Sequence, residues 1–199
     1  MKASGSVDFF ERQFRRQVGE ADFALNPFER LALPHLAGSV LDLGCGLGNL
    51  SLEAARRGCS VAALDASATA IERLRATALL QQLPLAAIQA DLDGFRIEQD
   101  YDTIVAIGLL MFFPRERAQA LLRQIVARVR PGGRAIVNVL IEGTSYLGMF
   151  APDGYYLFGA DELQHAFAGW TVLVEQHDSF AAPEQTSKEF ATLIAQKPR

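Results

Sequence analysis

The feature that most constrains this chain is residues 39–51, SVLDLGCGLGNLS, in which an apolar run leads into three glycines spaced two apart. An apolar run, a glycine turn and then a helical pattern form the first strand–turn–helix unit of many α/β proteins. Glycines at such a turn let backbone N–H groups and the positive end of the helix approach a bound ligand closely. The stretch therefore predicts a ligand site at the end of the first strand.

Length and composition limit the classes of protein to consider. The 199 residues, half of them hydrophobic, are enough for one domain over 1–199. The net charge of −4 argues against nucleic acid or an anionic membrane as partner. We find no apolar run of eighteen residues and no secretory signal, and Cys45 and Cys59 suit neither a disulfide framework nor a metal site. We expect a cytoplasmic monomer or homodimer without metal.

Short apolar runs alternate with segments of helical spacing between residues 39 and 141. Five runs read as strands buried on both faces, at 39–43, 60–64, 85–90, 103–107 and 134–141. Three helices are expected between them, at 49–57, 67–82 and 115–130, the last ending at the PGG sequence. This alternation predicts an open parallel sheet, with residues 38–141 as the core that binds the ligand.

The flanking segments break this rhythm. Residues 170–180 and 190–197 read as a closing antiparallel hairpin, joined by a polar loop and preceded by a short helix at 161–168. Residues 1–37 are expected to hold two lid helices whose phenylalanines dock over the first strand ends. The aromatic loop 142–160 is a second lid candidate, so residues 142–199 are assigned to the substrate side.

Spacing within the glycine turn discriminates between ligands. A dinucleotide fingerprint starting at Gly44 requires glycine or alanine at position 49, where this chain has Asn49. Asp42 lies two residues before Gly44, and its carboxylate would repel a pyrophosphate but attract a positively charged amino group. The turn is therefore expected to hold the amino acid end of a ligand.

Two further acids follow predicted strands. Asp65 ends the second strand, where a carboxylate can accept both ribose hydroxyls, and Asp91 ends the third, where it can fix an adenine edge or merely cap the next turn. Leu92 and Ile107 would form apolar walls for the ring. An amino acid, a ribose and an adenine together make S-adenosyl-L-methionine. The predicted cofactor residues are Asp42, Gly44, Cys45, Gly46, Asn49, Asp65, Ala66, Ser67, Asp91, Leu92 and Ile107.

These residues carry a family resemblance. VLDLGCGLG, VAALDAS, QADL and YDTIVAIG resemble, in order and spacing, the motifs of class I S-adenosylmethionine-dependent methyltransferases. The resemblance implies a Rossmann-like, mostly parallel seven-stranded α/β sheet in the order 3-2-1-4-5-7-6, with helices on both faces. MFFPRERAQALLRQI, FGADELQHAFAGWTV and FATLIAQKP look like the tellurite-resistance methyltransferases, which methylate small soft oxyanions. Where that family carries a His-Arg pair and a further arginine, this chain has His177 and Lys188.

The expected reaction is methyl transfer to a small molecule, a tellurite-like oxyanion or a thiol, with S-adenosyl-L-homocysteine as product. Soft nucleophiles need alignment more than a base, so no catalytic residue is assigned. Arg12, Phe112 and His177 are the candidate substrate-pocket residues. Two alternatives stay open, a nicotinamide oxidoreductase and a sensor module that binds the cofactor without catalysis.

Overall fold

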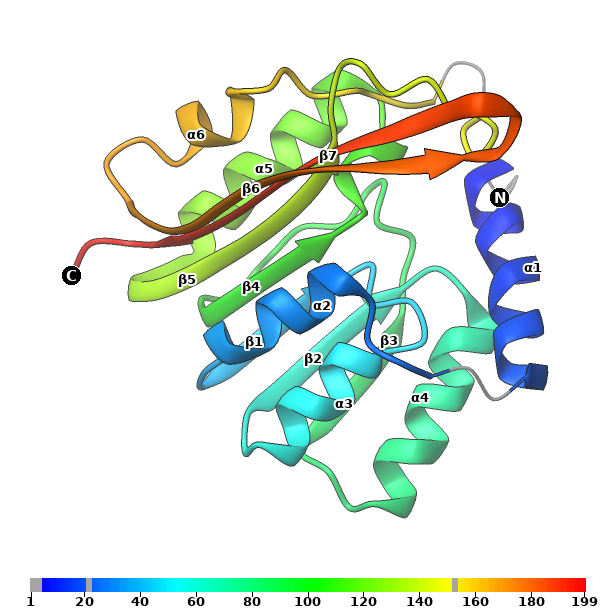
Figure 1. The fold of residues 1–199 in the computed structure, drawn as a ribbon. Helices are drawn as coiled ribbons and strands as arrows, with labels where there is room; N and C mark the ends of the chain where they lie inside the picture. The colour runs from blue at the N-terminus through cyan, green and yellow to red at the C-terminus, as the bar shows by residue number, and fades with distance from the viewer. Residues whose placement is uncertain (1–4, 21–22, 152–153) are drawn as a thin grey trace.

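A seven-stranded sheet forms the centre of the computed structural model, which describes residues 5–20, 23–151 and 154–199 (Figure 1). The strand order is β3-β2-β1-β4-β5-β7-β6, which confirms the order expected from the resemblance. Strands β1 to β5 pair in parallel, while β7 pairs antiparallel with both β5 and β6. The strands span Ser39–Leu43 (β1), Ser60–Asp65 (β2), Leu85–Gln89 (β3), Tyr101–Ile107 (β4), Val129–Leu140 (β5), Thr171–Ala182 (β6) and Thr186–Gln196 (β7).

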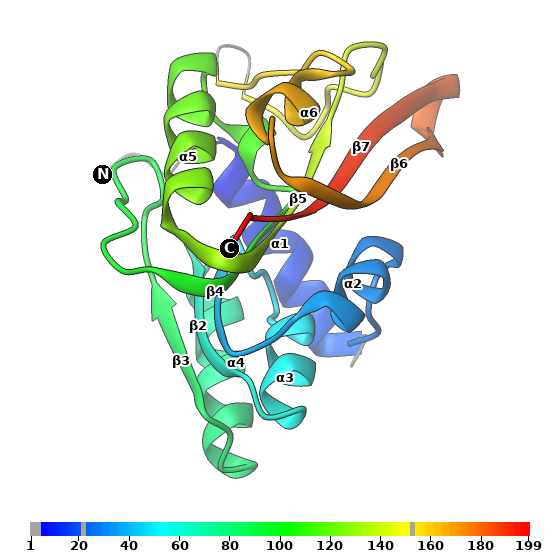
Figure 2. The ribbon, with the colours of Figure 1, turned by 90° about the vertical axis from the view of Figure 1, so that its left-hand side faces the viewer.

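Helices cover both faces of the sheet, as expected (Figure 2). Successive strand residues point to opposite faces, so Leu41 and Leu43 pack in the core under α5 and α6, while Val40 packs with α2, α3 and α4. The helices are α1 (Gly5–Glu20), α2 (Pro27–Ala32), α3 (Asn49–Arg56), α4 (Ala68–Leu80), α5 (Arg115–Arg128) and α6 (Glu162–Ala166), with short 3-10 turns at Leu33–His35, Leu110–Phe112 and Pro183–Gln185. None of these helices is long and apolar enough to span a membrane.

Local capping fixes where two of the helices begin. The Asn26 side chain accepts from the backbone N–H of Glu29, whose carboxylate accepts from the Asn26 N–H, and Pro27 supplies the preset φ of the first helical position of α2. Ser67 caps α4 by accepting from the N–H of Ala70. Both caps lie beside the ends of parallel strands.

The junction between α5 and β5 differs from the expectation. The helix ends at Arg128, because Val129 is already extended, so PGG at 131–133 lies inside β5 rather than ending the helix. A register shift between Tyr101 and Thr103 of β4 accommodates this early start of the strand. A Cβ on Gly133 would lie 2.6 Å from the Asp102 carbonyl oxygen, which explains a glycine at this close approach of two backbones.

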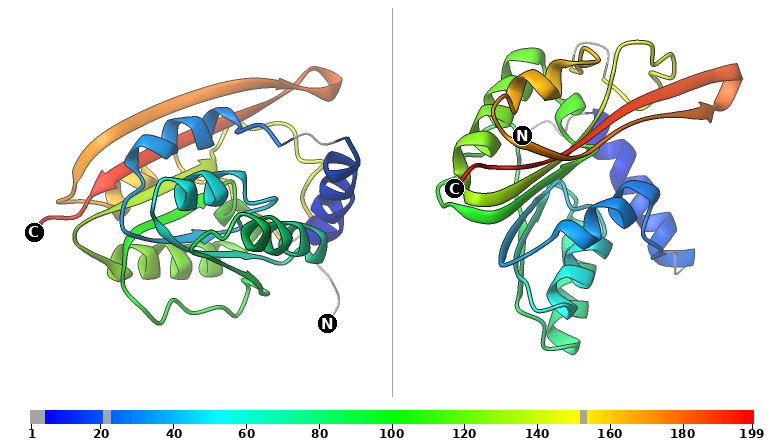
Figure 3. Two further views of the ribbon diagram at one scale, coloured as in Figure 1. Left: turned by 90° about the horizontal axis from the view of Figure 1, so that it is seen from below. Right: turned by 60° about the vertical axis from the view of Figure 1, so that its left-hand side comes forward.

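The closing hairpin is longer than expected. Pairing continues to Ala182 and Thr186, so only Pro183–Gln185 remains as the turn, with positive φ at Glu184 and Gln185. The polar residues before Phe190 read as loop, but they pair across the hairpin and are half-buried. Because β5 ends at Leu140, opposite Phe190, the hairpin tip projects beyond the sheet (Figure 3).

Candidate functional site

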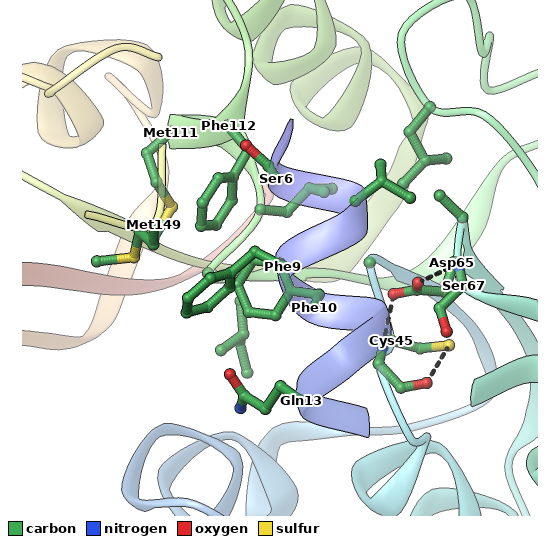
Figure 4. A pocket seen from close by; sticks show the side chains of 18 of the residues that line it. Ser6, Phe9, Phe10, Gln13, Cys45, Asp65, Ser67, Met111, Phe112 and Met149 are labelled. Carbon is green, nitrogen blue, oxygen red and sulfur yellow. Dashed lines mark hydrogen bonds between the residues drawn. The ribbon is translucent and has the colours of Figure 1, made fainter. Parts of the chain in front are cut away.

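A cavity of about 1100 Å³ opens at the carboxyl ends of β1, β2 and β4, with α1 lying across it (Figures 1 and 4). Open α/β sheets bind ligands at this edge. Figure 4 shows Cys45, Asp65 and Ser67 on one side of α1, and Met111 and Phe112 on the other. The volume of the cavity is at the upper end of the range for pockets that hold one ligand, so the cavity has room for a cofactor and a small second substrate.

The structure brings all eleven predicted cofactor residues together around this cavity. They come from the ends of β1, β2 and β4, the glycine turn, the starts of α3 and α4, and the loop after β3. Phe112, one of the three candidate substrate-pocket residues, also lines the cavity.

Arg12 and His177 do not line the cavity, contrary to the expectation, and both are exposed. Arg12 lies on α1 away from the helix face that carries Phe9, Gln13 and other lining residues. His177 pairs with Ala191, which packs in the core under α5 and α6, so its side chain lies on that face of the sheet and not on the face of Lys188 and Phe190, which line the cavity.

The glycine turn has a backbone that only glycine adopts without strain. Gly44, Gly46 and Gly48 all have positive φ. A Cβ on Gly46 would lie 3.1 Å from the Phe14 ring of α1, so the turn and the covering helix are in close contact. A Cβ on Gly48 would lie 2.5 Å from Leu74 of α4, and this third glycine therefore serves helix packing rather than the cavity.

Asp42 is a buried carboxylate beside the turn. The Ser51 hydroxyl of α3 donates to it at 2.6 Å. Burial, with a smaller effect of the carboxylates of Glu29 and Asp65, raises the pKa of Asp42 to about 7 against the lowering effect of Ser51. A carboxylate in this position favours a cationic ligand group, because a positive charge would compensate its burial.

Asp65 holds the turn and the start of α4 together. One of its oxygens accepts from the Gly46 N–H and the other from the Ser67 N–H, both at 2.8 Å. Burial raises the pKa of this carboxyl against the effect of these backbone donors. A carboxylate has about four acceptor positions, so two remain for a diol such as that of a ribose.

The loop after β3 forms another wall of the cavity. Asp91 is exposed and caps the loop by accepting from the Asp93 N–H at 3.0 Å, while Leu92 is buried. Arg117 of α5 donates to the carbonyl oxygens of Leu92 and Phe95 and so fixes the loop against α5. Sequence reasoning missed Arg117 because its partners are backbone atoms, which leave no pattern in the side chains.

Helix α1 is attached to α4 by a side-chain contact. The Glu11 carboxylate accepts from the Ser67 and Thr69 hydroxyls, both at 2.5 Å, and from Arg15 at 3.1 Å. Burial raises the pKa of Glu11, but these donors outweigh it and hold the pKa below its usual value. The helix that covers the cavity is therefore attached directly to the segment that follows Asp65.

Sequence reasoning missed other residues around the cavity. Arg73 of α4 donates to the Leu47 carbonyl and, at 3.2 Å, to Asn49 Oδ1, which supports the glycine turn from outside. Asn138 and Ser51 are buried polar residues of β5 and α3. A polar residue inside an apolar pattern, such as Asn138 in AIVNVLI, is the signal that could have found them.

The part of the cavity away from the glycine turn is apolar. Met111, Leu140 and Met149 form a buried cluster there, with aromatic side chains packed against it, among them Phe9, Phe112, Tyr146 and Phe190. Of these, Tyr146 and Met149 come from the loop after β5, the expected second lid. Within the described ranges, no group of three or more His, Cys, Asp or Glu is placed to hold a metal ion.

Comparison with known proteins adds to this geometry. Residues 40–133 match the family described as "Methyltransferase domain". The chain is 30% identical over 164 residues to "Hemagglutinin 1" of Eikenella corrodens, covering 79% of this chain and 54% of that protein. It is 27% identical over 165 residues to "Probable S-adenosyl-L-methionine-dependent methyltransferase TehB" of Haemophilus influenzae, covering 79% of this chain and 57% of that one. The chain thus spans about half the length of these curated relatives.

Among solved structures, the crystal structure of TehB from Haemophilus influenzae superposes with a TM-score of 0.75 at 22% identity. The match covers 96% of this chain and 67% of that one. The fold is therefore the Rossmann-like fold of that methyltransferase.

Proposed function

We propose that this chain, which carries a methyltransferase domain over residues 40–133 and is related in sequence to TehB, is a class I S-adenosyl-L-methionine-dependent methyltransferase acting on a small molecule. The observation that carries the proposal is the convergence of eleven residues, chosen from the sequence, on one cavity. Asp42 of β1 and Asp65 at the end of the neighbouring β2 both line it, which supports an amino acid head near the first and a ribose near the second.

The residues present fit this cofactor. Asp42 supplies a buried negative charge for the ammonium group, Asp65 has free acceptor positions for the ribose diol, and Leu92 and Ile107 offer apolar surface to the base. The cofactor, when bound, supplies a methyl group on a sulfonium. Asn49 fills the position where a nicotinamide fingerprint has a third glycine, so the geometry gives no support to an oxidoreductase.

The chain's own contribution to the reaction is alignment and exclusion of water. Phe9, Phe112 and Met111 line the apolar part of the cavity, and α1 covers it. Methyl transfer needs the nucleophile in line with the bond that breaks, and an apolar enclosure that fixes this geometry can supply much of the rate. This environment suits a soft nucleophile, and we propose a thiol or a tellurite-like oxyanion as the acceptor.

The proposal extends to the flanking segments. Residues 1–37 and 142–199 act as lid and substrate side of a single methyltransferase domain, in keeping with the lining residues that both contribute. We place the protein in a reducing compartment such as the cytoplasm, which agrees with two free buried thiols, Cys45 and Cys59. The small-molecule acceptor is its expected partner.

Calorimetry with S-adenosyl-L-homocysteine tests the cofactor assignment. We expect micromolar binding to the wild type and a loss of about tenfold or more in Asp65→Asn, because one charge-assisted contact to the ribose is lost. Asp100→Asn removes an exposed carboxylate that pairs with Arg128 outside the cavity and should bind as the wild type does. Folded protein that gives no binding heat would contradict the proposal.

Labelled cofactor separates an enzyme from a sensor. Incubation with a panel of thiols, tellurite, selenite and phenols should move the label to at least one acceptor, since only an enzyme transfers the methyl group. Binding without transfer to any of them would favour the sensor module.

A further inference from the structure

Two polar side chains interrupt the apolar part of the cavity, and both lie on the same face of the sheet. Asn138 of β5 pairs with Thr192 of β7, and Lys188 lies four residues before Thr192 on the same strand. Side chains two and four residues apart in a strand share a face, so both line the cavity from β5 and β7. Thr192, the partner of Asn138, and Lys188 are roughly 13 Å apart along β7, at about 3.3 Å per residue.

Asn138 has an unsatisfied acceptor. The residue is fully buried, and its Nδ2 donates to the Thr192 hydroxyl at 2.8 Å. Its Oδ1 is buried and has no hydrogen-bond partner among the described residues. A buried carbonyl oxygen without a donor is unfavourable, so its presence in a cavity wall points to a donor on a ligand.

Lys188 is a cation without a counterion. It is the one basic residue among the described residues that line the cavity, and no carboxylate pairs with it there. Its ammonium lies 4.8 Å from the centre of the Tyr146 ring. Burial lowers the pKa of Lys188, and an anion beside it would restore the charged form.

The acidic residues of the cavity lie elsewhere. Five carboxylates line it, and they come from α2, β1, β2 and the loop after β3: Glu29, Asp42, Asp65, Asp91 and Asp93. The cavity therefore has an acidic half at the proposed cofactor site and a single positive charge on β7. This separation of charge favours a cationic ligand group in one half and an anionic one in the other.

Apolar surface lies between the two polar residues. Phe190 lies between Thr192 and Lys188 on the same face of β7 and pairs with Leu140 of β5. Phe190 and Leu140 line the cavity together with Met111 and Met149. An inorganic oxyanion has no apolar surface to place against these side chains. A ligand that reaches from Asn138 to Lys188 must carry an apolar body in between.

We propose that the methyl acceptor is a small organic anion, in which an apolar body packs on Phe190, a carboxylate or similar oxyanion binds Lys188, and a hydrogen-bond donor binds Asn138 Oδ1. This rests on the proposed methyltransferase function and names the substrate class of the same site. Lys188 and Asn138 determine specificity and take no part in the bond changes.

Matched ligands test the charge. Protein saturated with S-adenosyl-L-homocysteine is titrated with 3-phenylpropanoate and with its uncharged amide, 3-phenylpropanamide, which has nearly the same shape. We expect the carboxylate to bind at least about tenfold more tightly, as a charge-assisted contact away from bulk water allows. Lys188→Met should abolish this preference and Lys188→Arg should keep part of it. Neither ligand has a donor at its phenyl end, so Asn138→Leu should leave this preference unchanged. A third ligand, 3-(4-hydroxyphenyl)propanoate, has a phenol that can donate to Asn138 Oδ1; it should bind the wild type more tightly than 3-phenylpropanoate and lose that advantage in Asn138→Leu.

Arg123→Met is the matched control, because it removes the same charge from an exposed position on α5 outside the cavity. It should keep the full preference for the carboxylate. Equal binding of the two ligands to the wild type, or a preference that survives Lys188→Met, would overturn the inference. Selenite that binds through Lys188 while 3-phenylpropanoate does not would also overturn it, in favour of an inorganic oxyanion.

The affinity for S-adenosyl-L-homocysteine is measured first on every variant, and it distinguishes a failure of this proposal from a failure of the proposed function. A wild type that fails to bind S-adenosyl-L-homocysteine contradicts the proposed function itself. Normal binding of that product together with no preference for the carboxylate contradicts the acceptor class alone.

Discussion

At the scale of single residues, Asp42 combines burial with a charge that the protein alone does not compensate. Its carboxyl is buried, accepts one hydrogen bond from Ser51 and has other acids nearby. In an unfolded chain the same group would titrate near 3.8, whereas in the folded protein the pKa is about 7. Between these values the folded state holds a proton that the unfolded state has lost.

The sign of the effect on stability follows from this difference. The contribution of Asp42 favours the folded state fully below about pH 3.8 and declines as the pH rises toward 7, because the unfolded state binds fewer protons in that window. We expect Asp42→Asn to remove this decline. Urea unfolding of both proteins between pH 4 and 8 checks it, and parallel curves for the two would contradict the raised pKa.

The same residue predicts a pH dependence of cofactor binding. An ammonium group stabilises the ionised carboxylate, so binding of S-adenosyl-L-homocysteine releases a proton from Asp42 and weakens as the pH falls from 8 to 6. Calorimetry in buffers of different ionisation heat measures that proton. Asp42→Asn should bind more weakly at pH 8 and show a flatter pH profile. An unchanged profile in the variant would assign the dependence to another group.

Residue identity was predictable from sequence where the backbone imposed it. Left-handed positions demand glycine, and strand ends leave room for an acid, so the turn, Asp42 and Asp65 all follow from spacing. Lys188 and Asn138 could not be placed in this way, because their positions in the cavity depend on the register of β7 against β5. That register is a long-range property, and a shift by one residue would reverse the face of every side chain.

At the scale of elements, α1 lies over the cavity, and we expect it to limit access. It contacts the glycine turn through Phe14 and α4 through Glu11. Seven of its residues line the cavity: Ser6, Val7, Phe9, Phe10, Gln13, Phe14 and Gln17. A surface helix that packs against the rest of the protein on one face is expected to open more readily than the core. Departure of the cofactor therefore depends on the Glu11 contact with Ser67 and Thr69.

Glu11→Ala should increase the dissociation rate of S-adenosyl-L-homocysteine by about three- to tenfold, since hydrogen bonds to a charged group stabilise the closed helix. Stopped-flow displacement measures this rate. Glu20→Ala, an exposed acid at the end of the same helix, is the control and should leave the rate unchanged. A dissociation rate that is the same in Glu11→Ala and the wild type would show that α1 does not limit release.

At the scale of the whole molecule, the order of the sheet and the layers were predictable because apolar periodicity and the motif order both point to them. The boundaries of the helices and strands were less predictable. The helix expected through residue 130 stops at Arg128, and the hairpin strands run to Ala182 and from Thr186. The first difference arises from the pairing of Val129 with Tyr101 of β4, and the second from pairing across the hairpin; local propensity reports neither.

At the junction of α5 with β5, Gly133 allows the backbones of β4 and β5 to approach closely. A Cβ there would meet the carbonyl oxygens of Asp102 at 2.6 Å and Arg130 at 2.9 Å, and backbone atoms cannot move aside as a side chain can. Gly133→Ala should lower the free energy of unfolding by about 2 kcal/mol or more, in the range of overpacking and strain. Gly94→Ala, where a Cβ would meet no atom within 4 Å, should change it by less than about 0.5 kcal/mol.

Urea denaturation compares the free energies of unfolding of the two variants. Since Gly133 lies away from the cavity, the folded fraction of either variant should bind S-adenosyl-L-homocysteine as the wild type does. Equal stability of both variants would mean that β4 and β5 can separate here at little cost, and that the early start of β5 does not constrain the sheet.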